Sequence, residues 1–257
     1  MKKIFRGFVM AFSGYSMSPK TKMEVNRENC SYILLFIPLI GALIGVIINR
    51  WGVAYPYLCN YSLLPAVVGA VIPSILSGAS HLDGFFRTVD ALRSHKSREE
   101  KIHILQDDAH GGYFAITACI CYFMLAIGVW SEILTNGFFI VSFGYIISRS
   151  LYGLSLLFFR HAGEGKADIY VPESKASKYI QGFILLVYIA VAGGFMLAIN
   201  KFVGCSCLIC AFVAFLYYLL VSYKSFGGVM EEIGGFFISI CEVAIPIGAL
   251  IAYKWWL

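Results

Sequence analysis

Seven long apolar stretches constrain this chain more than any other feature of its sequence. They are Tyr32–Ile48, Ser62–Leu76, Tyr113–Leu134, Phe138–Phe159, Gly182–Ile199, Phe202–Val221 and Gly235–Tyr253. Most approach the length of about 20 residues with which an apolar helix crosses a bilayer. None shows the alternation that the strands of a membrane β-barrel would have. We therefore expect an all-α, polytopic membrane bundle of about seven transmembrane helices.

The composition excludes the main soluble alternatives. Only 14% of the 257 residues are charged, whereas soluble domains carry about 25%. The formal charge of +5 therefore does not indicate a nucleic-acid binder, and the lipid bilayer is the expected partner. No long polar linker divides residues 1–257, which we interpret as a single integral-membrane domain. A homo-oligomer is compatible with this sequence but not required by it.

Two segments depart from a simple spanning helix. The second stretch is short and contains Pro65 and Pro73, so it is expected to kink, or to enter and leave the membrane on one side. Residues Ile4–Tyr15 predict an interfacial or partly inserted helix. The N-terminus begins like a signal peptide, but no cleavage site follows, so we expect it to be retained.

The cationic residues predict the orientation. With the N-terminus in the cytoplasm, sixteen of the twenty Lys and Arg residues are cytoplasmic and three are outside, while Arg149 lies in the fourth span. This asymmetry predicts a multi-pass protein of the inner (plasma) membrane. Thirteen of the fifteen acidic residues and all five histidines fall on the same side. Acids contribute little to topology, so their position indicates chemistry at the cytoplasmic face.

The densest polar segment is Ser80–Arg93. On a helix, Asp83, Arg87 and Asp90 share one face, beside His81, and Gly84 leaves room for a ligand or metal. Carboxylates of this kind suit Mg²⁺, which proteins share with substrate phosphates. The alternative is a solvated helix face with an Asp–Arg–Asp salt-bridge triplet.

Two further acidic segments lie next to glycines. Asp107 and Asp108 precede Gly111 and Gly112, where a metal site or an Asp N-cap is expected. Glu231 and Glu232 lie between two glycine pairs, Gly227-Gly228 and Gly234-Gly235. That arrangement fits cation or phosphate binding, or else a simple interfacial loop.

One cation lies inside a span. Arg149, beside Ser148, is a functional candidate because a charge within the membrane is costly. An Arg near the cytoplasmic end of a helix can bind a phosphate bidentately. The alternatives are snorkelling of the side chain and pairing with Glu242.

These motifs resemble the cobalamin synthase family. The family pattern H-L-D-G-x-x-D-T-x-D-G-L is similar to His81–Leu92 here, and K-D-S-x-x-G-A-F to Gln106–Tyr113. Ala11–Ser16, Phe36–Gly41, Ser148–Ser155 and Gly227–Gly235 also resemble the family. Where the family has a third Asp, this chain has Arg87.

The resemblance implies an Mg²⁺-dependent transferase that joins α-ribazole, or its 5′-phosphate, to adenosylcobinamide-GDP and releases GMP. It implies catalytic roles for His81, Asp83 and Asp90, and Mg²⁺ ligation by Asp83, Asp90, Asp107 and Glu232. Phosphate binding is assigned to Arg149, Ser148, Gly84, Gly111, Gly227 and Gly228. The charge of Arg87 competes with a metal for both neighbouring carboxylates, so one alternative is a degenerate relative that binds a corrinoid or nucleotide without turnover. A second alternative, outside the family, is a transporter with cytoplasmic gating charges.

Overall fold

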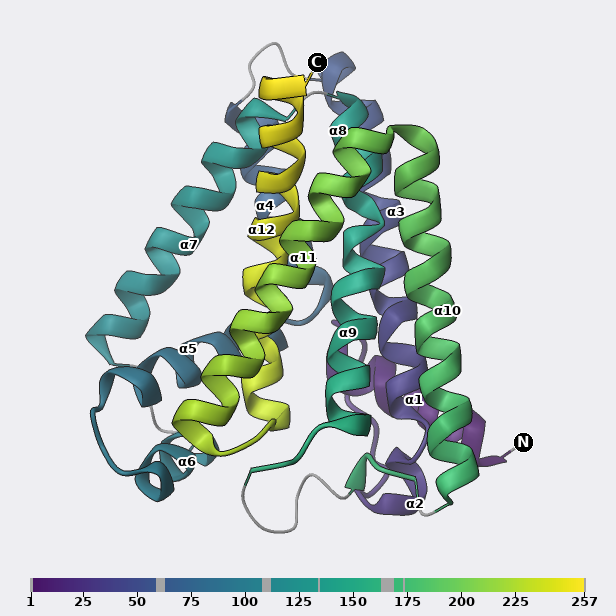
Figure 1. The fold of residues 1–257 in the computed structure, drawn as a ribbon, viewed down its shortest axis with the longest axis vertical. Helices are drawn as coiled ribbons and strands as arrows, with labels where there is room; N and C mark the ends of the chain where they lie inside the picture. The colour runs from purple at the N-terminus through teal and green to yellow at the C-terminus, as the bar shows by residue number, and fades with distance from the viewer. Residues whose placement is uncertain are drawn as a thin grey trace.

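The protein is a bundle of long helices in the computed structural model, which describes residues 2–58, 63–107, 112–133, 135–162, 169–172 and 174–256 (Figure 1). The helices are α1 (Lys2–Tyr15), α2 (Arg27–Cys30), α3 (Ile33–Leu58), α4 (Leu63–Leu76), α5 (Ser80–Arg93), α6 (Arg98–Gln106), α7 (Tyr113–Glu132), α8 (Thr135–Ser142), α9 (Gly144–Phe158), α10 (Lys175–Ile199), α11 (Lys201–Val221), the π-helical turn η2 (Ser222–Phe226) and α12 (Glu231–Trp256). The described residues contain no named strand. The predicted helical bundle is therefore confirmed.

Six helical segments of the described chain are long and apolar enough to cross a membrane, and a bent pair of helices brings the number to seven. Two of the predicted boundaries lie far from the observed ones. Helix α3 continues past Asn49 and Arg50 to Leu58, because the residues that follow are again apolar. Helix α10 begins at Lys175, seven residues before the predicted start at Gly182, because the more polar residues that precede the apolar stretch belong to the same helix.

The bent pair is α4 and α5, whose axes differ by 92°. The break lies at Gly78 and Ala79, which both adopt left-handed backbone conformations with φ of 62° and 58°. Such a conformation ends a helix and redirects the chain. Helix α4 itself continues through Pro73, so the bend lies after the second stretch and not at the prolines within it. Helix α5 runs across the end of the bundle instead of along it (Figure 1).

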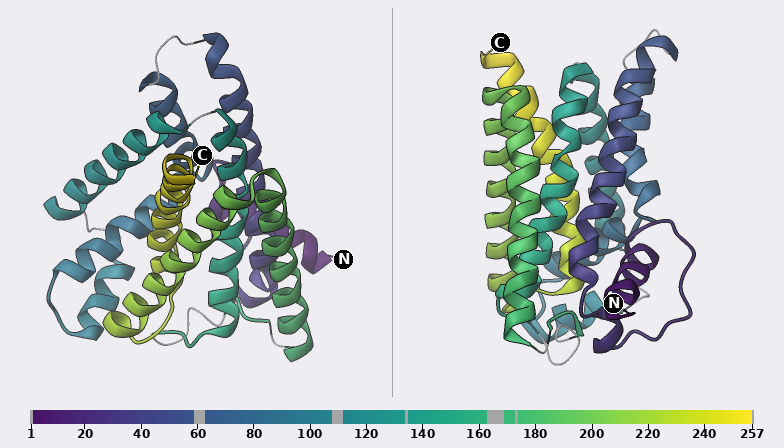
Figure 2. Two further views of the ribbon diagram at one scale, coloured as in Figure 1. Left: turned by 45° about the horizontal axis from the view of Figure 1, so that its top comes forward. Right: turned by 90° about the vertical axis from the view of Figure 1, so that its right-hand side faces the viewer.

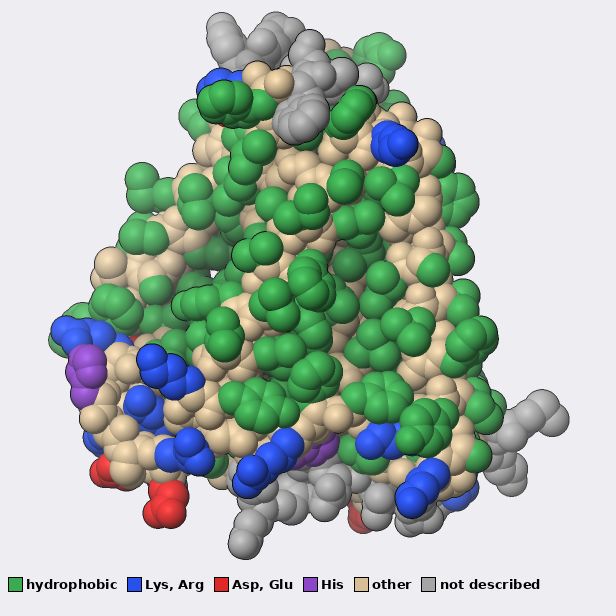
Figure 3. Space-filling model, viewed as in Figure 1, with side chains coloured by type: hydrophobic (Ala, Val, Ile, Leu, Met, Phe, Trp, Pro, Cys, Tyr) green, Lys and Arg blue, Asp and Glu red, His purple; other side chains and the backbone are tan. Residues whose placement is uncertain are grey.

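Charged side chains gather at one end of the bundle. On the face drawn in Figure 3, Lys, Arg, Asp, Glu and His side chains form a band along the end that carries α5 and α6, and the broad middle is apolar. Helix α1 lies near the same end, beside α3 (Figure 2). Its side chains Ile4, Phe5 and Phe8 are exposed, as expected for an interfacial helix.

Candidate active site

A cavity of about 350 Å³ lies at the charged end of the bundle. Its wall combines the end of α1, the first half of α5, the start of α12, the middle of α9 and Tyr170 from the segment 169–172. Its charged lining residues are Asp83, Arg87, Glu231 and Glu232, together with His81. Segments that lie far apart in the sequence therefore contribute to one site.

Helices α5 and α12 meet through two glycines. A Cβ added to Gly84 would lie 2.5 Å from the carbonyl oxygen of Glu232 and 3.0 Å from the Cα of Gly235. A Cβ on Gly235 would lie 2.5 Å from the carbonyl oxygen of His81. The two backbones are thus in direct contact. Gly84 also lines the cavity, and its predicted role of leaving room for a ligand or metal stays a prediction.

The two acidic residues of α5, Asp83 and Asp90, have different partners. The Oδ2 atom of Asp83 lies 2.9 Å from the Nη2 atom of Arg87, whose Nη1 donates a hydrogen bond to the Leu105 carbonyl at 3.3 Å. The Oδ2 atom of Asp90 accepts a hydrogen bond from the backbone N–H of Gly112 at 2.7 Å. Asp83 and Arg87 therefore stay at the cavity, while Asp90 ties the end of α5 to the start of α7.

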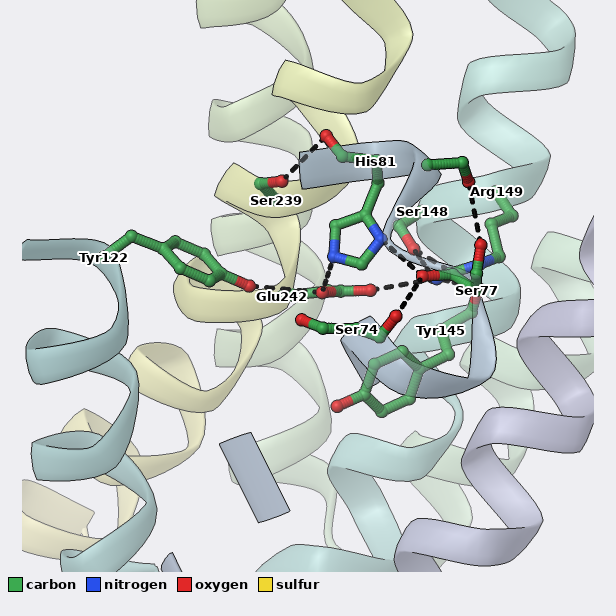
Figure 4. Close-up of polar contacts among 10 residues, drawn as sticks. Ser74, Ser77, His81, Tyr122, Tyr145, Ser148, Arg149, Ser239 and Glu242 are labelled. Atoms are coloured by element: carbon green, nitrogen blue, oxygen red, sulfur yellow. Dashed lines mark hydrogen bonds and ion pairs between the residues drawn. The ribbon is translucent and has the colours of Figure 1, made fainter. Parts of the chain in front are cut away.

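His81 points into the bundle between two polar groups. Its Nδ1 lies 2.7 Å from the Ser77 hydroxyl, and its Nε2 lies 3.2 Å from Oε2 of Glu242 (Figure 4). The side chain is 2% exposed. Its role as a general base or phosphate donor stays a prediction, and the structure shows both ring nitrogens facing protein groups.

Arg149 pairs with Glu242, the alternative that the sequence left open. Its Nη2 donates to Oε1 of Glu242 at 2.9 Å, and both side chains are 3% exposed (Figure 4). The hydroxyl of Tyr122 donates to the other carboxylate oxygen at 3.2 Å. Neither Arg149 nor Ser148 lines the cavity. Ser148 donates instead to the Tyr145 carbonyl at 3.2 Å, and phosphate binding by these two residues stays a prediction.

The sequence pointed to Glu231 only as part of an acidic pair, and it did not predict the two tyrosines that bind it. Its two carboxylate oxygens accept hydrogen bonds from the hydroxyls of Tyr15 at 2.7 Å and Tyr170 at 2.5 Å. Burial, with the nearby Glu231 carboxylate, raises the pKa of both tyrosines above the ordinary value, so both hydroxyls stay protonated and donate. The partners come from three distant segments, and no local sequence pattern connects them.

The remaining predicted glycines lie away from the cavity or outside the described residues. Gly227 has a φ of 87° and packs against Arg98, whereas Gly228 packs against the backbone of Arg160 and His161. Both shape the chain before α12, and their phosphate-binding role stays a prediction. Gly111, like Asp108, lies outside the described residues.

The four predicted metal ligands do not line one cavity. Asp83 and Glu232 line the cavity at the charged end, whereas Asp90 and Asp107 do not. Within the described ranges, no three His, Cys, Asp or Glu side chains form a group that could hold a metal ion. Mg²⁺ commonly uses one or two carboxylates and completes its shell with water and substrate phosphates. The hard oxygens of Asp83 and Glu232 fit that kind of site.

Comparisons with known proteins agree along nearly the whole chain. The sequence model of a family described as cobalamin-5-phosphate synthase matches residues 7–250. An adenosylcobinamide-GDP ribazoletransferase of Lachnoclostridium phytofermentans is 29% identical over 245 residues, which cover 95% of this chain and 92% of that protein. Proteins with the same name from Clostridium botulinum and Treponema denticola are 27% and 25% identical, with coverage of 95% and 93% of this chain and 96% and 95% of theirs. No solved structure matches.

Proposed function

We propose that this chain, which belongs to the cobalamin-5-phosphate synthase family, joins ribazole or its 5′-phosphate to adenosylcobinamide-GDP and releases GMP. The substrates are those in the printed names of its relatives. Neither a degenerate relative without turnover nor a transporter is favoured by a specific observation.

One observation carries the proposal: motifs far apart in the sequence meet at one cavity. Gly14 and Tyr15, His81 and Asp83, Tyr152, and the Glu231-Glu232 pair all belong to segments that resemble the family, and all line that cavity. Motifs that served only the packing of the helices would not all be expected to line one cavity. The convergence supports a substrate site at the charged end of the bundle.

The reaction is a phosphoryl-group transfer. A ribose hydroxyl of ribazole attacks the phosphorus that bears cobinamide, a new P–O bond forms, the bond from that phosphorus to GMP breaks, and the hydroxyl proton leaves. GMP is a good leaving group, so catalysis requires positioning and neutralisation of charge. Asp83, with a side chain 62% exposed at the cavity, is the carboxylate best placed to accept the proton or orient the hydroxyl.

In this proposal, Arg87 and the carboxylates of Asp83 and Glu232 act on the pyrophosphate. Arg87 is the one Lys or Arg among the described lining residues, and a guanidinium can bind two phosphate oxygens at once. Asp83 and Glu232 would hold Mg²⁺, which neutralises charge on the transferred phosphate when bound. Arg87 would thus bind phosphate at the position where the family has a third Asp.

The proposed location is the plasma membrane, with the active end facing the cytoplasm. The six apolar helices and the bent pair support a multi-pass protein. The orientation depends on the concentration of Lys and Arg at the end that carries the cavity.

Turnover by the purified protein in detergent tests the function. Adenosylcobinamide-GDP, α-ribazole and Mg²⁺ should yield GMP and adenosylcobalamin in equal amounts. Asp83→Ala should abolish GMP release, and Glu99→Ala, at an exposed acid outside the cavity, should not. Absence of GMP from the wild type at every Mg²⁺ concentration would refute the proposal.

A further inference from the structure

A second cavity, of about 330 Å³, lies beside the last turns of α5. Val89, Leu92 and Arg93 of α5 line it. On a helix these positions face away from Asp83 and Arg87, which line the candidate active site. The two cavities therefore lie on opposite sides of the same helix.

Aromatic residues of three spanning helices make much of the remaining wall. Phe114 lies near the start of α7, Tyr217 near the end of α11 and Phe236 near the start of α12. These are the helix ends at the charged side of the bundle (Figure 1). Phe114 and Tyr217 are 50% and 48% exposed. Aromatic side chains at this depth are typical of the boundary between membrane and water, so lipid is the solvent that meets this wall.

One cation is held at the edge of this wall. The Cζ atom of Arg93 lies 5.6 Å from the ring centre of Phe114, and its Nη1 lies 2.8 Å from Nε2 of His95, which also lines the cavity. The guanidinium is the donor in that pair, so His95 accepts through Nε2. The two contacts keep an exposed positive charge next to an apolar surface.

The charges around the second cavity favour an anion. No acidic side chain is among its described lining residues. Asp90, one turn before Arg93, accepts a hydrogen bond from the backbone N–H of Gly112 instead. Lys96, which follows His95, is exposed and adds positive charge to the same segment. A guanidinium can bind two oxygens of one phosphate.

A phospholipid combines the two chemistries that this cavity offers. Its phosphate lies at the membrane boundary, where Arg93 is, and its acyl chain lies deeper, along the apolar wall. The volume is at the lower end of the range for small-molecule pockets, roughly 300–1,000 Å³. It therefore accommodates the phosphate and the upper part of an acyl chain, while the rest of the lipid stays in the bilayer.

We infer that the second cavity binds one anionic phospholipid from the leaflet at the charged end, with its phosphate on Arg93 and an acyl chain against Phe114, Tyr217 and Leu92. This site goes beyond the proposed function and does not depend on it. Because Val89 and Leu92 belong to the helix that carries Asp83, a bound lipid also supports α5 from the side opposite the candidate active site.

Native mass spectrometry of the full-length protein tests the charge. The protein is delipidated in detergent and titrated with phosphatidylglycerol or with phosphatidylcholine of the same acyl chains. The wild type should retain one phosphatidylglycerol in preference to phosphatidylcholine. Arg93→Gln should weaken that binding about fivefold, the usual contribution of one cation near an anionic membrane surface.

Lys178→Gln is the matched control for the charge. The Nζ atom of Lys178 also lies over an aromatic ring, 5.3 Å from the centre of Phe158, but Lys178 does not line the second cavity. This variant should bind phosphatidylglycerol as the wild type does.

A second pair of variants tests the location. Val89→Phe places a larger side chain in the second cavity and should lower the affinity for phosphatidylglycerol. Val213→Phe, at a position 58% exposed on α11 and outside the cavity, should not. A ligand that binds the native state raises the thermal midpoint, so phosphatidylglycerol should raise the midpoint of Val213→Phe as much as that of the wild type, and that of Val89→Phe less. Arg93 is exposed, so Arg93→Gln remains the deciding variant if Val89→Phe fails to fold.

Three results would overturn the inference. They are equal binding of the two lipids, wild-type affinity of Arg93→Gln for phosphatidylglycerol, and displacement of the lipid by inorganic phosphate or adenosylcobinamide-GDP. The last result would assign the cavity to a soluble phosphate. None of these measurements requires turnover, so a failure of GMP release would refute the proposed function and leave the lipid site standing.

Discussion

Glu242 accepts a hydrogen bond from Arg149 at 2.9 Å, across 93 residues of sequence, in the interior of the bundle. The same carboxylate lies 3.2 Å from Nε2 of His81, so one acidic side chain joins α12, α9 and α5. A charge in the membrane interior is stable only when it is paired. The pair therefore fixes the position of the helix that carries the cavity's catalytic candidates.

Removal of Glu242 should strongly destabilise the protein. Glu242→Ala leaves the Arg149 guanidinium buried without its carboxylate, and we expect a loss of about 3–5 kcal/mol in the free energy of unfolding. The double variant Glu242→Met with Arg149→Met should recover most of that loss, because no unpaired charge remains. Denaturant unfolding in detergent measures both, and Glu132→Ala, at an exposed acid, is the control. Equal stability of the single and double variants would contradict the role of the pair.

The glycine contact between α5 and α12 should not tolerate a methyl group. Gly84→Ala places a Cβ 2.5 Å from the Glu232 carbonyl oxygen, and separating the helices should cost roughly 1–3 kcal/mol and reduce turnover. Gly194→Ala is the matched control, since its Cβ meets nothing within 4 Å. Thermal unfolding with parallel GMP-release assays distinguishes them. Wild-type stability of Gly84→Ala would show that the helices can separate freely.

Arg87 should set the Mg²⁺ requirement. Its guanidinium pairs with Asp83 at 2.9 Å, so a cation must compete with it. An ion pair in contact with solvent is worth about 0.2–1 kcal/mol, which predicts that Arg87→Gln lowers the half-saturating Mg²⁺ concentration by no more than about fivefold. Arg87→Gln should also raise KM for adenosylcobinamide-GDP. Mn²⁺ binding followed by electron paramagnetic resonance supplies a readout apart from turnover. If Arg87→Gln bound the metal with unchanged affinity, Arg87 would have no influence on metal binding.

The orientation predicts which loops are accessible from each side. A reporter fused after Lys96 should be cytoplasmic, and one fused after Lys201 should be external. Paired fusions to green fluorescent protein, active inside, and alkaline phosphatase, active outside, give opposite patterns at the two positions. A phosphatase signal at Lys96 would reverse the topology and place the cavity outside.

Helix α6 should lose order in acid. Ser97 accepts a hydrogen bond from the backbone N–H of Glu100, and the Glu100 carboxylate accepts one from the Ser97 N–H at 3.0 Å. The Ser97 hydroxyl and backbone lower the pKa of Glu100. Because the folded pKa is lowered, this stabilisation is complete above the ordinary glutamate pKa and is lost as the pH falls through the lowered value.

Hydrogen exchange over residues 98–106, corrected for intrinsic rates, measures that effect. Ser97→Ala should reduce protection at neutral pH roughly 2- to 10-fold and should remove most of the acid dependence. A Ser97→Ala variant with the wild-type acid response would show that Glu100 is not responsible.

The length of the apolar stretches predicts most of the fold, and the spacing of the polar residues predicts parts of the site. The stretches at 113–134 and 202–221 nearly coincide with α7 and α11, because a membrane helix is defined by its own composition. The pairing of Arg149 with Glu242 was one of several alternatives, because sequence shows that a buried charge needs a partner but not which one. The pairing of Glu231 with Tyr15 and Tyr170 was missed, because these tyrosines reach Glu231 only through the packing of α1 and the segment 169–172 near the start of α12.

The direct contact of Gly84 with Gly235 gives the cavity one rigid wall and one adaptable wall. On the α5–α12 side, backbone meets backbone at this contact, so the distance between the two carboxylate-bearing helices is fixed there. On the opposite side, side chains of α1 and Tyr170 make the wall, and these can be exchanged one at a time. Relatives that accept substrates of different size should therefore differ along the α1 side of the pocket and keep the same spacing between Asp83 and Glu232.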